Sequence, residues 1–162
     1  MNADLTQKFN QILENSSEKD QQVLEILLDG LVRKQTKQNG SYLGGILGST
    51  SRLTDDKQYE MIIPNTDLIQ NSLDIVHGGI TATLLDSAMG SLVHYHLPEG
   101  QAAVTSEMKI NYVAPGKGLE LRCVANIIHQ GSKIVVTEGK VFRDDGKLIA
   151  HATGSFFIIT KR

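Results

Sequence analysis

The sequence predicts an α+β fold in which an antiparallel β-sheet wraps around one long apolar α-helix, with a helical extension before it. Three observations lead to this expectation. The chain has 162 residues, so we expect one domain with a single core and no second catalytic domain. Only residues 79–94 are long and apolar enough to be the main helical partner of a sheet. Four apolar runs separated by turn-forming residues follow, and an antiparallel sheet needs one face covered.

The first part of the chain is expected to be helical. Leu, Ile and Val recur at helical spacing over residues 23–31. Ser17 and Asp20 have the spacing of a capping box, so we expect a helix that begins there and runs to about Lys37. The character of the sequence then changes. The expected organisation is a helical extension over residues 1–38 and a main domain over residues 39–162.

We expect the main domain to begin with two strands, residues 42–52 and 58–64, joined by a turn at residues 54–56. The glycines of the first strand would loosen it. The apolar helix follows the pair Gly78 and Gly79. Short segments rich in Gly, Pro, Asp and Ser then separate the last strands, as turns do. These four expected strands are residues 103–114, 119–128, 134–142 and 148–159.

Composition and charge argue against several classes of protein. Charged residues make up 21% of the chain and the net charge is -2, so the chain has no positive field for nucleic acid. The single cysteine, Cys123, lies in an apolar stretch and is expected to be a buried hydrophobic residue. The start of the chain lacks a signal pattern, and no apolar run approaches the ~18 residues of a membrane span. We therefore expect a cytoplasmic protein with no nucleic-acid or membrane partner.

The main domain contains a set of motifs in a definite order. Asn71 precedes the stretch Val76-His77-Gly78-Gly79, which opens the apolar helix, and Asp86 follows on that helix. The segment Thr105-Ser106-Glu107-Met108-Lys109-Ile110-Asn111-Tyr112 comes next. This arrangement resembles the hotdog-fold acyl-CoA thioesterases, especially the phenylacetate-degradation (PaaI-like) and thioesterase superfamily member 2-like branch. The resemblance extends over about residues 42–159 and implies a hotdog fold and a thioester hydrolase that releases CoA and a carboxylic acid.

Thioester hydrolysis makes two demands that these residue types can meet. It needs an activated water or nucleophile, and it needs hydrogen-bond donors at the carbonyl oxygen, where negative charge develops. The backbone N–H groups of Gly78 and Gly79 lie at a helix N-terminus and are natural donors. The two glycines would equally allow tight entry of the helix into the sheet. On a helical wheel, Asp86 lies at the margin of the apolar arc. This position is compatible with a functional carboxylate and equally with an ordinary half-exposed surface residue.

The resemblance implies a role for each of these positions. Asp86 would act as the general base to water or as a nucleophile that forms a mixed anhydride. The Gly78 amide would be the oxyanion donor, with Gly79 beside it in substrate binding. His77 would shape the loop and polarise the substrate side of the site. Asn71 would orient the substrate carbonyl or the water, unless it is only a turn-forming residue.

Thr105 matches the position at which related enzymes carry a Ser or Thr that helps to hold the attacking water. Strand alternation disagrees with this role, because it predicts that Thr105 points away from the apolar face of its strand. Ser106 is then the hydroxyl on the apolar side and the substitute for Thr105 in substrate contact. On this reading the apolar face carries Val104, Met108, Ile110 and Tyr112, and the other face carries Thr105, Glu107 and Lys109.

Coenzyme A would need cations for its phosphates and an apolar tunnel for its acyl group. Lys133 follows one predicted turn, and Arg143 and Lys147 flank another; each is otherwise a solvated turn charge. CoA would be part of the substrate, and no further cofactor is expected. The histidines have no spacing typical of a zinc site, so no metal is expected. Four residues would line the acyl pocket or pack in the core: Leu85, Met89, Met108 and Tyr112.

A single hotdog chain would leave one edge of its sheet open, which natural proteins rarely tolerate. The resemblance implies that the active site forms between two subunits, with the His-Gly-Gly loop of one facing the helix carboxylate of the other. We therefore expect a homodimer or a dimer of dimers that binds acyl-CoA.

Two other functions are compatible with a hotdog domain. One is a non-catalytic acyl-CoA sensor with a DNA-binding N-terminal segment. The first 38 residues carry five Lys or Arg against six Asp or Glu, so this segment lacks the basic excess expected of such a module. The other is a hydratase or dehydratase, which needs an arrangement of His and carboxylate that the sequence does not show.

Overall fold

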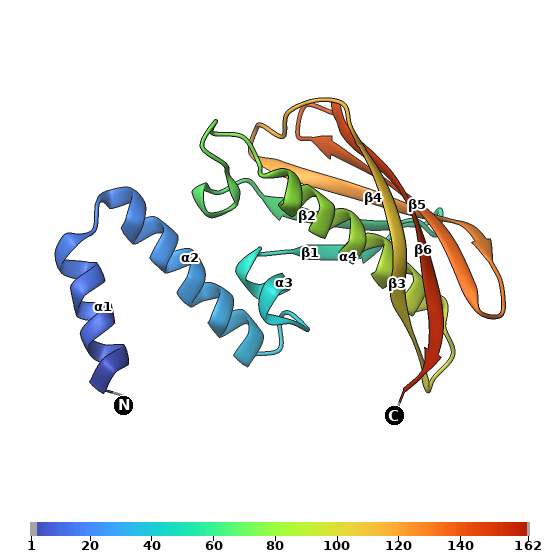
Figure 1. The fold of residues 1–162 in the computed structure, drawn as a ribbon, viewed down its shortest axis with the longest axis horizontal. Coiled ribbons are helices and arrows are strands. Elements are labelled where there is room, and N and C mark those ends of the chain that lie inside the picture. The colour runs from blue at the N-terminus through green and yellow to red at the C-terminus, as the bar shows by residue number, and fades with distance from the viewer. Residues whose placement is uncertain (1–2, 162) are drawn as a thin grey trace. The chain divides into compact units, whose positions relative to one another are not determined.

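The computed structural model describes residues 3–161, so Met1, Asn2 and Arg162, which the predicted domain ranges include, lie outside it. The chain divides into two compact units, the first ending at Gly48 and the second beginning at Ser49 (Figure 1). The order of elements is helical first, then two strands, the long helix and four strands, as predicted, with one additional short helix.

The first unit consists of three helices, α1 (Ala3–Asn15), α2 (Glu18–Gln35) and α3 (Tyr42–Ile46). The predicted capping box begins α2: the Asp20 N–H donates to Ser17 Oγ at 3.2 Å, and the Ser17 N–H donates to Asp20 Oδ2 at 3.0 Å. These bonds satisfy backbone donors that the first helical turn leaves free. The prediction of this helix is confirmed.

The predicted strand over residues 42–52 is wrong for most of its length. Residues 42–46 form α3, which begins where Ser41 Oγ accepts a hydrogen bond from the Gly44 N–H at 3.0 Å. Gly45 lies against α2, and a Cβ atom there would stand only 2.4 Å from the Gly30 carbonyl oxygen. The glycines that suggested a loosened strand therefore serve a close contact between two helices.

The second unit contains one six-stranded sheet and the helix α4 (Gly78–His96), preceded by a short 3-10 turn at Asp67–Ile69. All neighbouring strands are antiparallel, and their order across the sheet is β1-β2-β4-β5-β6-β3. The prediction of four strands after the helix is confirmed to within a few residues. The strands are β1 (Thr50–Leu53), β2 (Tyr59–Pro64), β3 (Gln101–Tyr112), β4 (Glu120–Gln130), β5 (Ile134–Arg143) and β6 (Leu148–Thr160).

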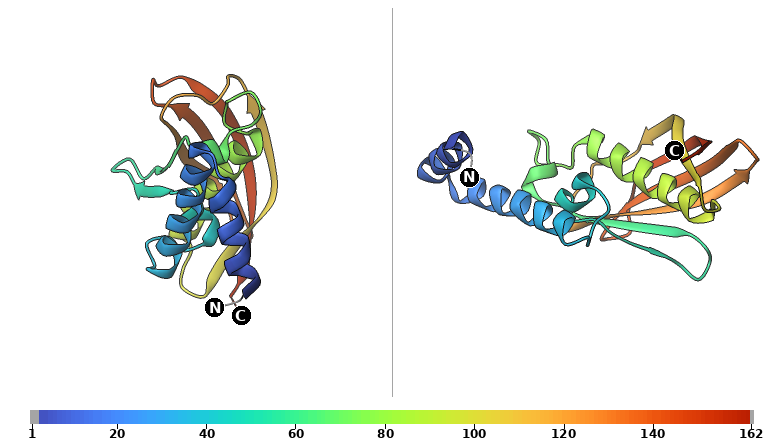
Figure 2. Two further views of the ribbon diagram at one scale, coloured as in Figure 1. Left: turned by 90° about the vertical axis from the view of Figure 1, so that its left-hand side faces the viewer. Right: turned by 90° about the horizontal axis from the view of Figure 1, so that it is seen from below.

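The core of this unit is the contact between α4 and one face of the sheet, along which the helix lies in Figure 2. Leu85, Ala88 and Met89 on α4 have no exposed surface. Gly139 of β5 allows this approach, because a Cβ there would stand 2.9 Å from Leu85 Cδ2. Burial of this apolar surface is the main source of stability for such a layer.

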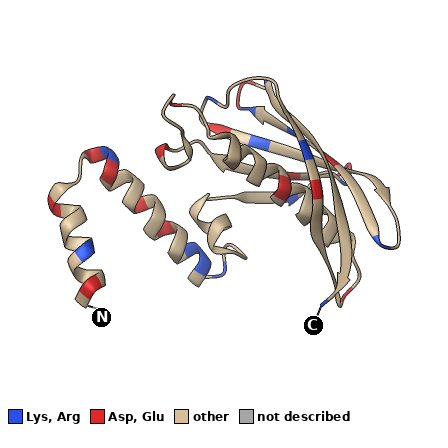
Figure 3. Ribbon diagram, viewed as in Figure 1, with Lys and Arg blue, Asp and Glu red and all other residues tan. Residues whose placement is uncertain are grey.

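Charged residues are sparse on α4 (Figure 3). Asp86 is its only Asp, Glu, Lys or Arg, while His94 and His96 lie in its last turn, where cations are favoured. None of the helices within residues 3–161 is long and apolar enough to span a membrane.

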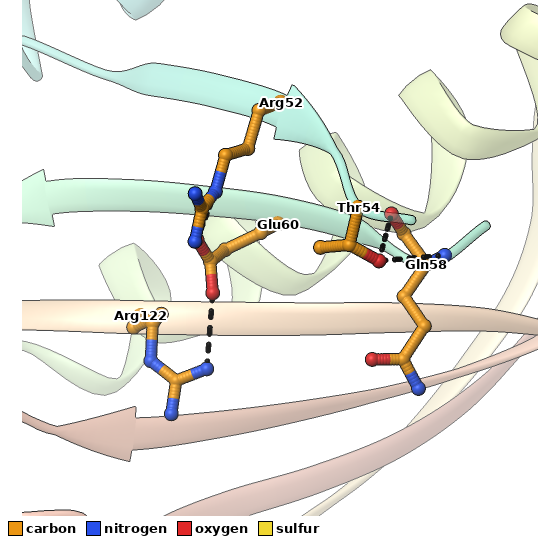
Figure 4. Close-up of polar contacts among 5 residues, drawn as sticks. All are labelled: Arg52, Thr54, Gln58, Glu60 and Arg122. Atoms are coloured by element: carbon orange, nitrogen blue, oxygen red, sulfur yellow. Dashed lines mark hydrogen bonds and ion pairs between the residues drawn. The ribbon is translucent and has the colours of Figure 1, made fainter. Parts of the chain in front are cut away.

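A buried carboxylate ties β1, β2 and β4 together on the face of the sheet away from α4 (Figure 4). Glu60 Oε1 accepts from Arg52 Nε at 2.8 Å, and Glu60 Oε2 accepts from an Arg122 guanidinium N–H at 3.1 Å. The Arg122 guanidinium also lies over the Phe142 ring. Burial raises the pKa of Glu60, but the hydrogen bonds and charges of the two arginines outweigh burial and hold that pKa below its ordinary value.

We predict that Glu60→Gln lowers the free energy of unfolding by about 1 to 3 kcal/mol at pH 7, because it removes the charge that both arginines face. The pKa of Glu60 is lower in the folded than in the unfolded chain. Its ionised form therefore stabilises the fold fully above the ordinary pKa of 4.5, and this contribution is lost as the pH falls through the folded-state pKa.

Urea denaturation over a pH series checks this prediction. The difference between wild type and Glu60→Gln should shrink on acidification below about pH 4.5. Glu99→Gln, on the exposed turn after α4, is the control and should have little effect at any pH. A difference that stays constant from pH 7 to pH 3 would contradict the proposed ion-pair contribution.

Candidate active site

The first turn of α4 leaves one backbone donor free. His77 is the N-cap, and its Nδ1 accepts a hydrogen bond from the Gly79 N–H at 2.9 Å. The Gly78 N–H forms no hydrogen bond within the part of the chain that the structure describes. Of the two predicted donors, Gly79 is therefore occupied and Gly78 is available, at the end of a helix whose dipole favours negative charge.

The loop that carries His77 is held by backbone bonds from both sides. The His77 N–H donates to the Ile69 carbonyl at 2.9 Å, and the Val76 N–H donates to the Gly116 carbonyl at 2.9 Å. The Gly78 carbonyl accepts from the Tyr112 hydroxyl at 2.9 Å. The entry into α4 is therefore fixed by the sheet and its loops.

Asp86 and Thr105 lie together within one chain. The Thr105 hydroxyl of β3 donates to Asp86 Oδ1 at 2.7 Å. Asp86 is half-buried at the margin of the apolar helix, and Thr105 is exposed. The pair leaves the second carboxylate oxygen and the lone pairs of the hydroxyl available to a water molecule.

The predicted orientation of Thr105, away from the apolar face, is wrong. The register between β3 and β6 shifts between Thr105 and Glu107, so Ser106 is the extra residue of a β-bulge. The bulge reverses the alternation, and Thr105 faces α4 together with Met108 and Tyr112 beyond it. Ser106 is exposed and does not take its place.

Asn71 has the turn-forming role that we considered as an alternative. Its Oδ1 accepts from the Leu73 N–H at 2.9 Å, an Asx turn, and its own N–H donates to the Ile75 carbonyl at 2.9 Å. Its Nδ2 has no hydrogen-bond partner among residues 3–161, so it can still donate to a ligand. Asn71 begins the segment that leads into His77.

The cationic residues predicted for CoA phosphates do not form one cluster. Lys133 lies at the β4–β5 turn, whereas Arg143 and Lys147 lie at the β5–β6 turn, at the opposite end of β5. Arg143 forms two hydrogen bonds with Asp145, and those bonds, with one from the Lys147 N–H and the nearby positive charges, lower the pKa of Asp145. Arg143 is thus engaged within its own turn.

Within one chain the two parts of the predicted site are far apart. Gly78 and Asp86 are separated by eight residues of α4, which corresponds to about 12 Å along the helix axis. An oxyanion donor must lie about 3 Å from the carbonyl oxygen, whereas a general base must lie within hydrogen-bond reach of the proton that it accepts, directly or through one water.

Comparison with known proteins places this arrangement in a family. The family model described as thioesterase superfamily matches residues 73–150, which include His77, Gly78, Asp86 and Thr105. A Bacillus halodurans protein, whose crystal structure was determined with CoA, is 47% identical with a TM-score of 0.87, and the match covers 93% of this chain and 99% of that one. The chain belongs to the thioesterase superfamily. The predicted family and the hotdog fold are confirmed.

Two curated relatives are similar over a shorter span. Acyl-coenzyme A thioesterase 13 of Mus musculus is 35% identical over 82 residues, 49% of this chain and 58% of that protein. The medium/long-chain acyl-CoA thioesterase YigI of Salmonella typhimurium is 25% identical over 97 residues, 52% of this chain and 63% of that protein. The chain spans less than two thirds of the length of these relatives.

Other groups capable of chemistry lie outside this site. Burial raises the pKa of the Cys123 thiol to about 12, so it stays protonated at neutral pH and is the buried hydrophobic residue that we predicted. Among residues 3–161, no group of three or more His, Cys, Asp or Glu side chains is placed to hold a metal ion. Leu85 and Met89, which we considered for the acyl pocket, are fully buried core residues.

We predict that Thr105→Val lowers the kcat of thioester hydrolysis by about 10- to 100-fold, because it removes the hydroxyl beside Asp86 while keeping the size of the side chain. Thr105→Ser should retain most of the activity. Thr153→Val is the matched control, because Thr153 alternates with buried Ala152 and Gly154 and so lies on the far face of the neighbouring strand. Equal kcat values for Thr105→Val and wild type would exclude the hydroxyl from the reaction.

Proposed function

We propose that the protein hydrolyses the thioester of an acyl-CoA or aryl-CoA to free CoA and a carboxylic acid. The observation that carries the proposal is the contact between Asp86 and Thr105, a carboxylate and a hydroxyl on an otherwise uncharged helix and its neighbouring strand. The curated relatives named as acyl-CoA thioesterases and the neighbour determined with CoA support this substrate class.

Each group has a defined task in this reaction. Asp86 accepts a proton from the attacking water, or itself attacks the carbonyl carbon to form a mixed anhydride that water then hydrolyses. Thr105 orients Asp86 and the water. The Gly78 N–H stabilises the negative charge on the carbonyl oxygen. The carbon–sulfur bond breaks, and the CoA thiolate leaves and takes up a proton; the reaction consumes one water and requires no cofactor.

The proposed active site includes two chains. The axial separation of about 12 Å between Gly78 and Asp86, from the helical rise, favours a site in which the donor and the carboxylate acting on one thioester come from different copies. Strand β3 supports this arrangement, because it lies at the edge of the sheet with one side unpaired and carries Val104 and Tyr112, both about half exposed. An open edge of this length favours association. The minimal unit is then a homodimer, and a dimer of dimers is compatible with it.

The two-chain site also gives the separated cations a role. Lys133 and Lys147 lie at opposite ends of one sheet, so in a dimer a CoA molecule that crosses the interface could reach the cation of either chain. Lys133 is the better candidate for a phosphate contact, because the other turn already contains the Arg143–Asp145 pair.

We predict that wild type releases thiol from members of a panel of acyl-CoA thioesters, from acetyl to palmitoyl and including phenylacetyl and benzoyl. Asp86→Asn should lower kcat by about 100-fold or more, because it removes the base with little change in volume. Asp55→Asn, in the exposed β1–β2 turn, is the control for loss of a carboxylate. If wild type released no thiol from any member of the panel while acyl-CoA raised its Tm, the proposal of an enzyme would fail and a non-catalytic acyl-CoA-binding protein would be favoured.

The two-chain site predicts complementation between inactive variants. Gly78→Pro removes the N–H and fits the backbone, because residue 78 is the first of α4 and His77 already has φ -59 and ψ 134, as a residue before proline requires. It should lower kcat by about 100-fold or more. Gly78→Ala keeps the N–H and meets only ordinary contacts with Tyr112 at 3.7 Å, so it is the control.

Refolding a mixture of Gly78→Pro and Asp86→Asn chains should restore about a quarter of the wild-type activity, because half of the dimers are mixed and each contains one intact site. Either variant refolded alone should stay inactive. No recovery in a mixture shown to contain mixed dimers would place the whole site within one chain.

A further inference from the structure

The peptide group between Gly78 and Gly79 is held at both of its polar atoms by side chains. Its carbonyl accepts from the Tyr112 hydroxyl at 2.9 Å, and its N–H donates to His77 Nδ1 at 2.9 Å. The Tyr112 ring also packs on Gly78, since three of its atoms lie 3.7 Å from the position of a Cβ at that residue. One side chain comes from the loop before α4 and the other from β3.

These two hydrogen bonds, which together form a clamp on the 78–79 peptide, counteract the backbone flexibility of two adjacent glycines. A Gly-Gly pair populates more backbone conformations than any other dipeptide, and the first turn of a helix readily frays. An oxyanion donor is effective only when its direction is set before the reaction, so that no reorganisation is needed in the transition state. Holding the peptide that follows Gly78 restricts rotation about the Gly78 backbone and thereby the direction of the Gly78 N–H.

The β-bulge at Ser106 allows Thr105 and Tyr112 to contact the same helix. The bulge places Thr105 and Tyr112 on the same side of β3, toward α4. One strand therefore contacts both chemically active parts of the helix, Asp86 through Thr105 and Gly78 through Tyr112. Tyr112 is 54% exposed, so its hydroxyl bond competes with water and contributes little to global stability.

We propose that Tyr112 is a positioning residue: together with His77 it clamps the 78–79 peptide and sets the direction of the Gly78 N–H toward the thioester oxygen. This inference rests on the proposed function of the site. It assigns to Tyr112 a role in turnover, in place of a role in lining the acyl pocket.

The test compares Tyr112→Phe with Tyr59→Phe. Tyr59 is a matched control, because its hydroxyl also forms one exposed bond, to Ser51 Oγ at 2.8 Å, on the far edge of the same sheet. Tyr112→Phe should lower kcat by about 5- to 30-fold with KM changed less than about twofold, since a loosened donor acts in the transition state more than in binding. Tyr59→Phe should match wild type, and both variants should keep the wild-type Tm.

A double-mutant cycle separates positioning from pocket lining. In Gly78→Pro the N–H that Tyr112 orients is gone, so adding Tyr112→Phe should lower kcat no further. An acyl-pocket residue would instead change KM and would keep its full effect in the Gly78→Pro background. Either of these results, or an unchanged kcat in Tyr112→Phe alone, would overturn the clamp.

Amide hydrogen exchange gives a readout that does not depend on activity. The Gly79 N–H is protected by His77 and should exchange several-fold faster in Tyr112→Phe, with no change in Tyr59→Phe. If wild type hydrolysed no thioester, the proposed function would fail, and this exchange rate alone would decide whether the clamp exists. Equal Gly79 exchange in Tyr112→Phe and wild type would refute it.

Discussion

The packing of α4 against one face of the sheet determines where polar chemistry can occur in this protein. Seven residues of the helix are buried, and Gly139 permits an approach that a larger side chain would block. A helix that is apolar on most sides has few places for a charge. Asp86 lies at the margin of the apolar surface, where the Thr105 hydroxyl donates to it. The Gly78 N–H lies in the first turn of the helix, where no helical hydrogen bond can satisfy it. The candidate site therefore combines the one acidic side chain of this helix with a backbone donor of its first turn.

The elements around this helix are largely predictable from sequence because their signals are local. The four C-terminal strands alternate with Gly, Pro and Asp turns, and the capping box at Ser17 and Asp20 involves neighbouring residues. The error over residues 42–52 has a different origin. Position 45 has no room for a Cβ atom because it contacts Gly30, which lies fifteen residues away on another helix. No local sequence pattern indicates that contact.

The candidate site shows the same division. The roles expected for Asp86, His77 and Gly78 come from the resemblance, and their places on or just before α4 come from the predicted helix. The side toward which Thr105 points does not, because the bulge at Ser106 adds one residue without a sequence signature and inverts all later alternation. The separation of Lys133 from Arg143 could, by contrast, be predicted from the order of the strands. Successive turns of an antiparallel meander lie at opposite ends of the strand between them, so these residues could not share one phosphate within a chain.

Strand β3 connects the chemistry with assembly. An edge strand of twelve residues with exposed apolar side chains favours association with other chains. In this chain the same strand supplies Thr105 to the carboxylate and Tyr112 to the helix entry. In the proposed dimer, covering this edge would bury the strand that orients both halves of the site and would bring each half toward its complement on the second copy. The bulge that interrupts the regular ladder of β3 is then what allows one strand to contact both the first turn of α4 and Asp86 in its middle.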